Sequence, residues 1–128
     1  MPDFLFYGYT ERSAAMRHEL PVAILDPFLL GIVDGRLHVL ANPLEADRIA
    51  AAAPDAVLHQ MRDLGLLELL ESGLPGHEVD LELASRAAAA MGVPEAVADP
   101  DLPLAVAERL RADGIALILY YEAVALAP

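Results

Sequence analysis

One short segment of the chain, TERSAAMRHELP at residues 10–21, concentrates side chains that could act together on a ligand. Its ionisable members include Arg12, Arg17, His18 and Glu19. The guanidinium of Arg offers a fork of N–H donors that matches a carboxylate, and the imidazole of His titrates near neutral pH. The segment could therefore hold a carboxylate, or it could be an ordinary solvated loop. The residue types alone favour the solvated loop.

Elsewhere the sequence lacks the spacing of a catalytic or metal site. The four histidines are scattered, at His18, His38, His59 and His77, without the helical spacing that zinc sites use. The acidic pair Asp99 and Asp101 stands before a predicted helix, where carboxylates commonly cap free N–H groups. G-x-S-x-G, G-x-G-x-x-G and P-loop motifs are absent, which leaves a nucleophile elbow or a nucleotide-binding loop without support. We therefore expect no catalytic residue and no metal ligand in this chain.

The composition indicates one acidic, folded domain. The chain has 128 residues, of which 56% are hydrophobic, and this is enough for a substantial core. The formal net charge is −12, which opposes binding to a phosphate backbone, so we expect no nucleic-acid partner. No uncharged run is long enough to span a bilayer and no signal peptide is recognisable, so we expect a cytoplasmic protein without a membrane partner.

The elements that must position these side chains are organised around residues 28–54, FLLGIVDGRLHVLANPLEADRIAAAAP. Asp34-Gly35 between two apolar runs predicts a tight β-hairpin, because Gly tolerates the positive φ that such turns need. Asn42 is predicted to cap the helix that follows, with Pro43 in its first turn and Pro54 at its end.

The rest of the chain alternates short apolar runs with amphipathic segments. Strands are predicted at residues 3–9, 56–59, 95–98 and 115–121, and helices at residues 63–72, 78–91 and between Asp99 and Gly114. This alternation predicts an α/β fold, a mixed sheet with helices on both faces. The predicted core consists of Phe4, Phe6, Phe28, Leu30, Ile32, Val39, Leu110, Ile115, Leu117 and Leu119. Leu117 is predicted to lie on a central strand.

The order and the amino-acid sequences of several segments resemble those of a known family. FLLGIVDGRLHVLANPLEADRI, LPLAVAERLRADGIAL and RHELPVAILDPF are similar to segments of the N-terminal domain of the creatinase/prolidase/aminopeptidase P family of metallopeptidases. The resemblance covers about residues 3–122. It implies a ribonuclease H-like α/β domain over residues 1–128, with a mixed sheet of about six strands.

The resemblance also implies a function for the chain. In this family a pita-bread catalytic domain follows the N-terminal domain and binds two divalent metals (Mn, Co or Zn). That domain is absent from this chain, so the chain alone is not expected to be an enzyme. The implied role is that of the non-catalytic domain of an Xaa-Pro dipeptidase or aminopeptidase. Its implied partners are the C-terminal catalytic domain of the parent enzyme and a second copy in a homodimer, and its implied task is to shape substrate access.

The family's loop after the first strand faces the active-site cleft. The usual motif of this loop is N-x-R-Y-L-T-G-F, and the present sequence has MRHEL at residues 16–20. The resemblance therefore makes Arg17 and His18 the candidates for substrate access. Two alternatives stay open: a standalone interaction module with the same fold, and a small-molecule-binding α/β domain that uses the carboxyl ends of its strands.

Overall fold

The Asp34-Gly35 hairpin lies at the centre of the fold. The structure, a computed structural model, describes residues 2–120. Strands β2 (Phe28–Val33) and β3 (Arg36–Ala41) pair antiparallel on either side of the turn. Asp34 has φ 52° and Gly35 has φ 76°, the two positive values that a type I′ turn requires. The predicted hairpin is confirmed.

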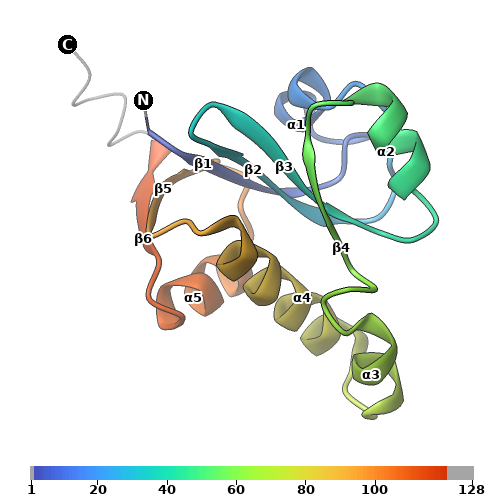
Figure 1. The fold of residues 1–128 in the computed structure, drawn as a ribbon. Coiled ribbons are helices and arrows are strands. Elements are labelled where there is room, and N and C mark those ends of the chain that lie inside the picture. The colour runs from blue at the N-terminus through green and yellow to red at the C-terminus, as the bar shows by residue number, and fades with distance from the viewer. Residues whose placement is uncertain (1, 121–128) are drawn as a thin grey trace.

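The hairpin belongs to a six-stranded mixed sheet with the order β4-β3-β2-β1-β5-β6 (Figure 1). The other strands are β1 (Phe4–Gly8), β4 (Val57–Gln60), β5 (Glu95–Ala98) and β6 (Ala116–Leu119). β2 is antiparallel to both of its neighbours, whereas the pairs β3–β4, β1–β5 and β5–β6 are parallel. All strands except β2 therefore run in the same direction.

Helices cover both faces of the sheet (Figure 1). One face packs against α1 (Ala14–Glu19) and α2 (Ala46–Ala52). The other packs against α3 (Leu66–Glu71), α4 (Gly76–Met91) and α5 (Leu104–Ala112). Within residues 2–120, the single α/β domain with a mixed six-stranded sheet and helices on both faces is confirmed. No helix in that range is long and apolar enough to cross a bilayer.

β2 divides its side chains between the two cores because successive residues of a strand point to opposite faces. Phe28 and Leu30 are buried with α1 and α2, while Leu29 and Val33 are buried with α4. Gly31 lies on the α4 face, where a Cβ would come within 2.9 Å of the Met91 sulfur. The small residue therefore allows α4 to approach the sheet closely.

Nine of the ten predicted core residues are buried or partly buried, and the prediction is wrong for Leu119 on β6. Five of these residues are buried: Phe28, Leu30, Val39, Leu110 and Ile115. Four are partly buried: Phe4, Phe6, Ile32 and Leu117. Leu119 is 52% exposed, and β6 is an edge strand rather than a central one. A continuous apolar run does not reveal a strand's place in the sheet, which the pairing of distant segments decides.

Several predicted helix boundaries are corrected by the structure. Residues 10–21 contain α1, whose N-terminus is capped by Ser13 Oγ accepting from Met16 N at 3.1 Å. Asn42 Oδ1 accepts from Leu44 N at 2.9 Å and so stabilises a turn, and α2 begins only at Ala46. The helix predicted from residue 63 begins at Leu66, after a left-handed Gly65. The last residue of the strand predicted at 115–121 lies outside the described residues.

The packing of helices on both faces of the sheet gives a stability prediction for two leucines in contrasting environments. Leu110→Ala should lower the free energy of unfolding by about 2–5 kcal/mol, because it leaves a cavity under α5. Leu119→Ala, on the outer strand, should change it by no more than about 0.5 kcal/mol. Urea unfolding of both variants followed by circular dichroism measures the difference. Equal losses in the two variants would contradict the edge position of β6.

Candidate functional site

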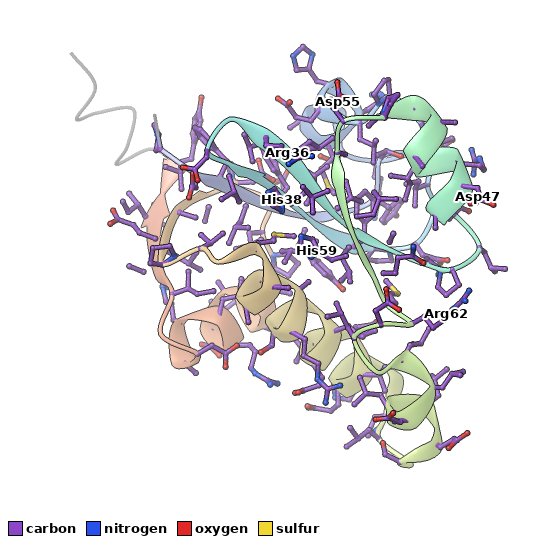
Figure 2. All side chains as sticks on the ribbon, viewed as in Figure 1. Arg36, His38, Asp47, Asp55, His59 and Arg62 are labelled. Carbon is purple, nitrogen blue, oxygen red and sulfur yellow. The ribbon has the colours of Figure 1, made fainter. Side chains whose placement is uncertain are left out.

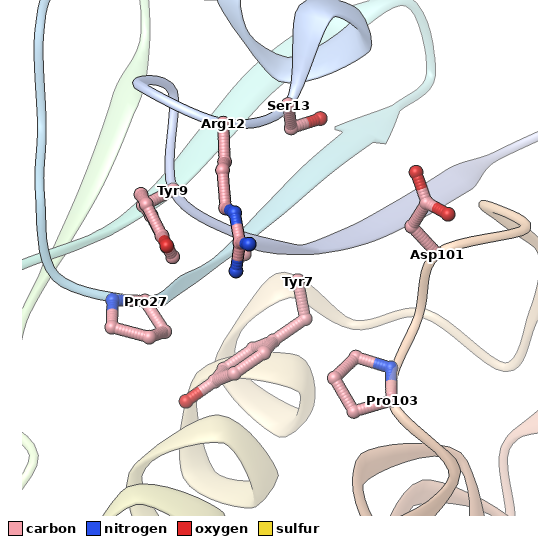
Figure 3. A pocket seen from close by; sticks show the side chains of 8 residues that line it. Tyr7, Tyr9, Arg12, Ser13, Pro27, Asp101 and Pro103 are labelled. Carbon is pink, nitrogen blue, oxygen red and sulfur yellow. The ribbon is translucent and has the colours of Figure 1, made fainter.

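A pocket of about 420 Å³ opens where the carboxyl ends of β1 and β5 meet (Figure 3). These strands are parallel neighbours, with Leu5 opposite Ala98. After β1 the chain returns through β2 on one side, and after β5 it passes through α5 to β6 on the other side. Diverging connections of this kind leave a crevice, which is where open α/β sheets bind ligands. The side chains that give the pocket its chemistry are Tyr7, Tyr9, Arg12, Ser13, Asp101 and Pro103.

The loop after β1 is fixed by the hydroxyl of Thr10, the one buried polar residue among those described. Its Oγ1 accepts from the N–H of Ile24 at 2.7 Å and donates to the carbonyl of Val22. The N–H of Glu11 also reaches the Ile24 carbonyl at 3.4 Å. These contacts hold the loop against the segment that leads into β2. The neighbouring pocket residues Tyr9 and Arg12 are positioned by the same anchor.

The opposite wall of the pocket is a turn built on Asp99. Its backbone N–H donates to Leu5 O at 3.0 Å, which joins the turn to β1. Its carboxylate accepts from the N–H of Asp101 at 3.2 Å, and its carbonyl from Leu102 at 2.9 Å. The N-cap position of α5 is occupied by Pro103, so the predicted helix-capping role of the acidic pair is wrong. Burial raises the pKa of the Asp99 carboxyl, the hydrogen bond from the Asp101 N–H opposes this effect, and the charge of Asp101 adds to it.

The floor of the pocket is Tyr7, which keeps its proton across the physiological range. Burial, together with the nearby charge of Asp80, raises the pKa of the Tyr7 hydroxyl to about 12. The pKa of Asp80 is itself raised, first by burial and then by repulsion from Asp26. The pocket therefore has a neutral aromatic floor and several carboxylates around it. Arg12 is the cation that lines it.

The structure places the two predicted substrate-access residues outside this pocket. Arg17 and His18 are exposed in the last turn of α1. The Arg17 guanidinium turns back and donates to the carbonyls of Thr10 at 3.2 Å and Glu11 at 3.4 Å. Of the cluster noted in the sequence, only Arg12 lines the pocket. Nothing in the structure tests the proposed contact of Arg17 or His18 with a substrate.

His38 on β3 and His59 on β4 lie side by side, a contact that the sequence did not predict (Figure 2). His38 Nδ1 lies 2.9 Å from His59 Nε2, and the ring planes differ by 12°. Burial lowers the pKa of both imidazoles. The charge of Arg36 lowers the pKa of His38 further, and Asp3 and Asp34 oppose this effect, while His38 lowers that of His59. The parallel pairing of β3 with β4 brings the two residues together, and the sequence carries no local signal of it.

The described residues offer no group of three or more His, Asp or Glu side chains that could hold a metal ion. The two paired histidines are too few ligands for a structural zinc site, which uses four. Among residues 2–120, the pocket between β1 and β5 is the place best built for non-covalent binding of a ligand.

The fold is similar to that of an Xaa-Pro dipeptidase from Bacillus anthracis, with a TM-score of 0.60 and 12% sequence identity. The match covers 92% of this chain and 28% of that one, so the chain spans little more than a quarter of the dipeptidase's length. No protein-family model matches the sequence, and no curated protein matches it either. At this level of identity the likeness shows the fold. It agrees with the fold that the sequence resemblance implied.

The anchoring role of Thr10 can be tested with two substitutions. Thr10→Val keeps the volume but leaves the Ile24 N–H and the Val22 carbonyl without their partner, and should cost about 1–3 kcal/mol of unfolding free energy. Thr10→Ser retains the hydroxyl and should cost less. Chemical denaturation compares the two variants. A Val variant as stable as the Ser variant would show that the hydroxyl does not hold the loop.

The histidine pair gives a pH dependence. Both pKa values are lowered in the folded chain, so the unfolded chain binds protons first as the pH falls below about 6.5. The pair's contribution to stability is therefore complete above that pH and is lost as the pH falls toward the folded-state pKa values. We expect the wild type to lose more stability between about pH 7.5 and about pH 5.5 than the double variant His38→Gln/His59→Gln. Parallel urea titrations measure both losses, and equal losses would contradict the lowered pKa values.

Proposed function

We propose that this chain is the non-catalytic N-terminal domain of an Xaa-Pro peptidase, and that it contributes to dimerisation and to substrate access. The observation that carries the proposal is the structural match, in which nearly all of this chain corresponds to a minor part of an Xaa-Pro dipeptidase. A match that covers nearly all of one chain and a small part of the other is expected when the shorter chain corresponds to one domain of a larger enzyme. The order of hairpin, helix and final helix–strand unit in the sequence supports the same assignment.

In this proposal the chemistry belongs to a separate catalytic domain. Hydrolysis by two metal ions needs several convergent carboxylate and imidazole ligands, held so that the ions lie about 3.5–4 Å apart. We assign those ligands, and the Mn, Co or Zn pair that they would bind, to the catalytic domain. The present domain would act by shape and by contacts at its surface.

The substrate-access role is assigned to the loop after β1 and to α1. Arg17 and His18 are exposed there, on a segment whose backbone is fixed by Thr10. Apart from its bonds to two backbone carbonyls, the Arg17 guanidinium has no partner within residues 2–120. A neighbouring domain or subunit could therefore present a substrate carboxylate to it. The free donors of a guanidinium suit that contact.

The dimerisation role is supported by exposed apolar side chains. Leu67 and Leu70 on α3 are 64% and 59% exposed, and Leu74 just beyond the helix is 46% exposed. Exposed apolar groups that lie together commonly mark protein contacts.

A standalone small-molecule-binding module is the second candidate function. The observation that favours it is the pocket between β1 and β5, which forms within this chain alone.

The proposal is tested on the full reading frame that contains this chain. We expect that frame to continue into a metal-binding domain, and the complete protein to hydrolyse Xaa-Pro dipeptides when Mn²⁺ is supplied. The 128-residue chain alone should not hydrolyse them. In the complete protein, Arg17→Ala should raise KM about 10- to 150-fold with little change in kcat, because one charge-assisted hydrogen bond to the substrate is lost.

Arg111→Ala is the matched control for this experiment. Arg111 lies on the opposite face of the sheet and, like Arg17, donates from its guanidinium to a backbone carbonyl, that of Leu117 at 3.3 Å. It should leave KM unchanged. A complete protein without peptidase activity on any Xaa-Pro dipeptide would overturn the enzyme assignment. An unchanged KM for a folded Arg17→Ala variant would overturn only the substrate-access role.

A further inference from the structure

We propose that the pocket between β1 and β5 binds a small zwitterionic amino acid with an apolar side chain, its carboxylate on Arg12 and its ammonium group at Asp101. The site forms within this one chain, so the proposal is independent of any peptidase activity. It gives Arg12 a role in ligand binding that is separate from the substrate-access role proposed for Arg17 and His18. Four features of the pocket carry it.

The first feature is the position of Arg12. Its side chain extends into the pocket from the loop after β1 (Figure 3). Within residues 2–120 its guanidinium has no hydrogen bond or ion pair, in contrast to Arg17, Arg86 and Arg109, which all have partners. The backbone N–H of Arg12 is held by the carbonyl of Tyr9 at 3.1 Å, so the base of the side chain is fixed. An unpaired guanidinium fork in a pocket suits a ligand carboxylate.

The second feature is a carboxylate on the opposite wall. Asp101 lines the same pocket as Arg12, from the turn before α5 (Figure 3). Its backbone N–H bonds to Asp99, and its own carboxylate has no side-chain or backbone donor within the described part of the chain. Two unlike charges that line one pocket without pairing leave room for a molecule that carries both. A zwitterion satisfies each of them.

The third feature is the apolar surface between these charges. Tyr7, Tyr9, Pro27 and Pro103 supply rings on several sides. The volume of about 420 Å³ lies in the range of small-molecule sites. The Tyr7 hydroxyl, with its pKa raised to about 12, stays neutral and adds no further charge. The pocket therefore suits an aliphatic or aromatic side chain between the two charged ends of its ligand.

The fourth feature is the surrounding negative charge, which excludes ligands with several negative charges. Asp80 lies near Tyr7, Asp26 lies near Asp80, and Asp99 lies beside Asp101. A phosphate with two charges would be repelled by these carboxylates and could meet one guanidinium only. A single carboxylate balanced by an ammonium group brings no net charge into this field. The walls are set beforehand by Thr10 and by the Asp99 turn, which lowers the entropy cost of binding.

The test is an NMR titration of the 15N-labelled chain with phenylalanine and two analogues that each lack one charge. N-acetylphenylalanine has no ammonium group, and phenylalaninamide has no carboxylate. We expect saturable shifts at residues 7–13 and 99–103 with phenylalanine, at a Kd on the order of 1 mM or tighter. Both analogues should bind about 10-fold or more weakly, since each loses one charge-assisted contact.

Variants separate the two contacts. Arg12→Ala should weaken phenylalanine about 10-fold or more but leave phenylalaninamide unaffected, while Asp101→Asn should weaken phenylalanine and leave N-acetylphenylalanine unaffected. Arg36→Ala is the control, because Arg36 is an exposed arginine at the start of β3 that donates to Asp55 O at 3.1 Å, away from the pocket. It should bind phenylalanine as the wild type does. Absence of saturable shifts, or equal affinity in the Arg12 and Arg36 variants, would overturn the proposal.

Discussion

The hydroxyl of Thr10 is the contact on which the functional surface of this domain depends. It is fully buried, and it satisfies a donor and an acceptor of the segment that leads into β2. Within residues 2–120, no hydrogen bond of any other side chain joins the loop after β1 to the segment that leads into β2. Because that loop also carries Arg12 and leads into α1, one buried hydrogen-bonding group positions both the pocket and the surface proposed to shape substrate access. A polar group inside the core is stable there only because its partners are fixed as well.

The direction of one strand creates the pocket. β2 is the antiparallel strand of the sheet, so the chain leaves β1 toward one side and leaves β5 toward the other. The carboxyl ends of two parallel neighbours then lie beside an open crevice rather than under a shared helix. The hairpin that ends at Asp34-Gly35 brings the chain back into the common strand direction at β3.

The ligand selectivity proposed for the domain rests on charge. The chain has a net charge of −12, and its surface repels polyanions. Against that background, Arg12 and Arg17 have different environments although they are five residues apart in one segment. Arg17 stabilises the backbone of its own loop and Arg12 extends into the pocket. The same residue type therefore supports two distinct proposals, substrate access at the surface of α1 and ligand binding between β1 and β5.

The sequence by itself determined the elements and the fold class, because hairpin turns, helix stops and apolar periodicity are local properties. Asp34-Gly35 required its turn, Gly92 ended α4 with φ 71°, and the alternation of strands with helices indicated the α/β layers. Only the tertiary structure decided that β6 lies at the edge, that His38 meets His59, and that Arg12 rather than Arg17 lines the pocket. These features depend on which distant strands pair and on where a side chain points once its loop is anchored. No pattern of neighbouring residues encodes such long-range contacts.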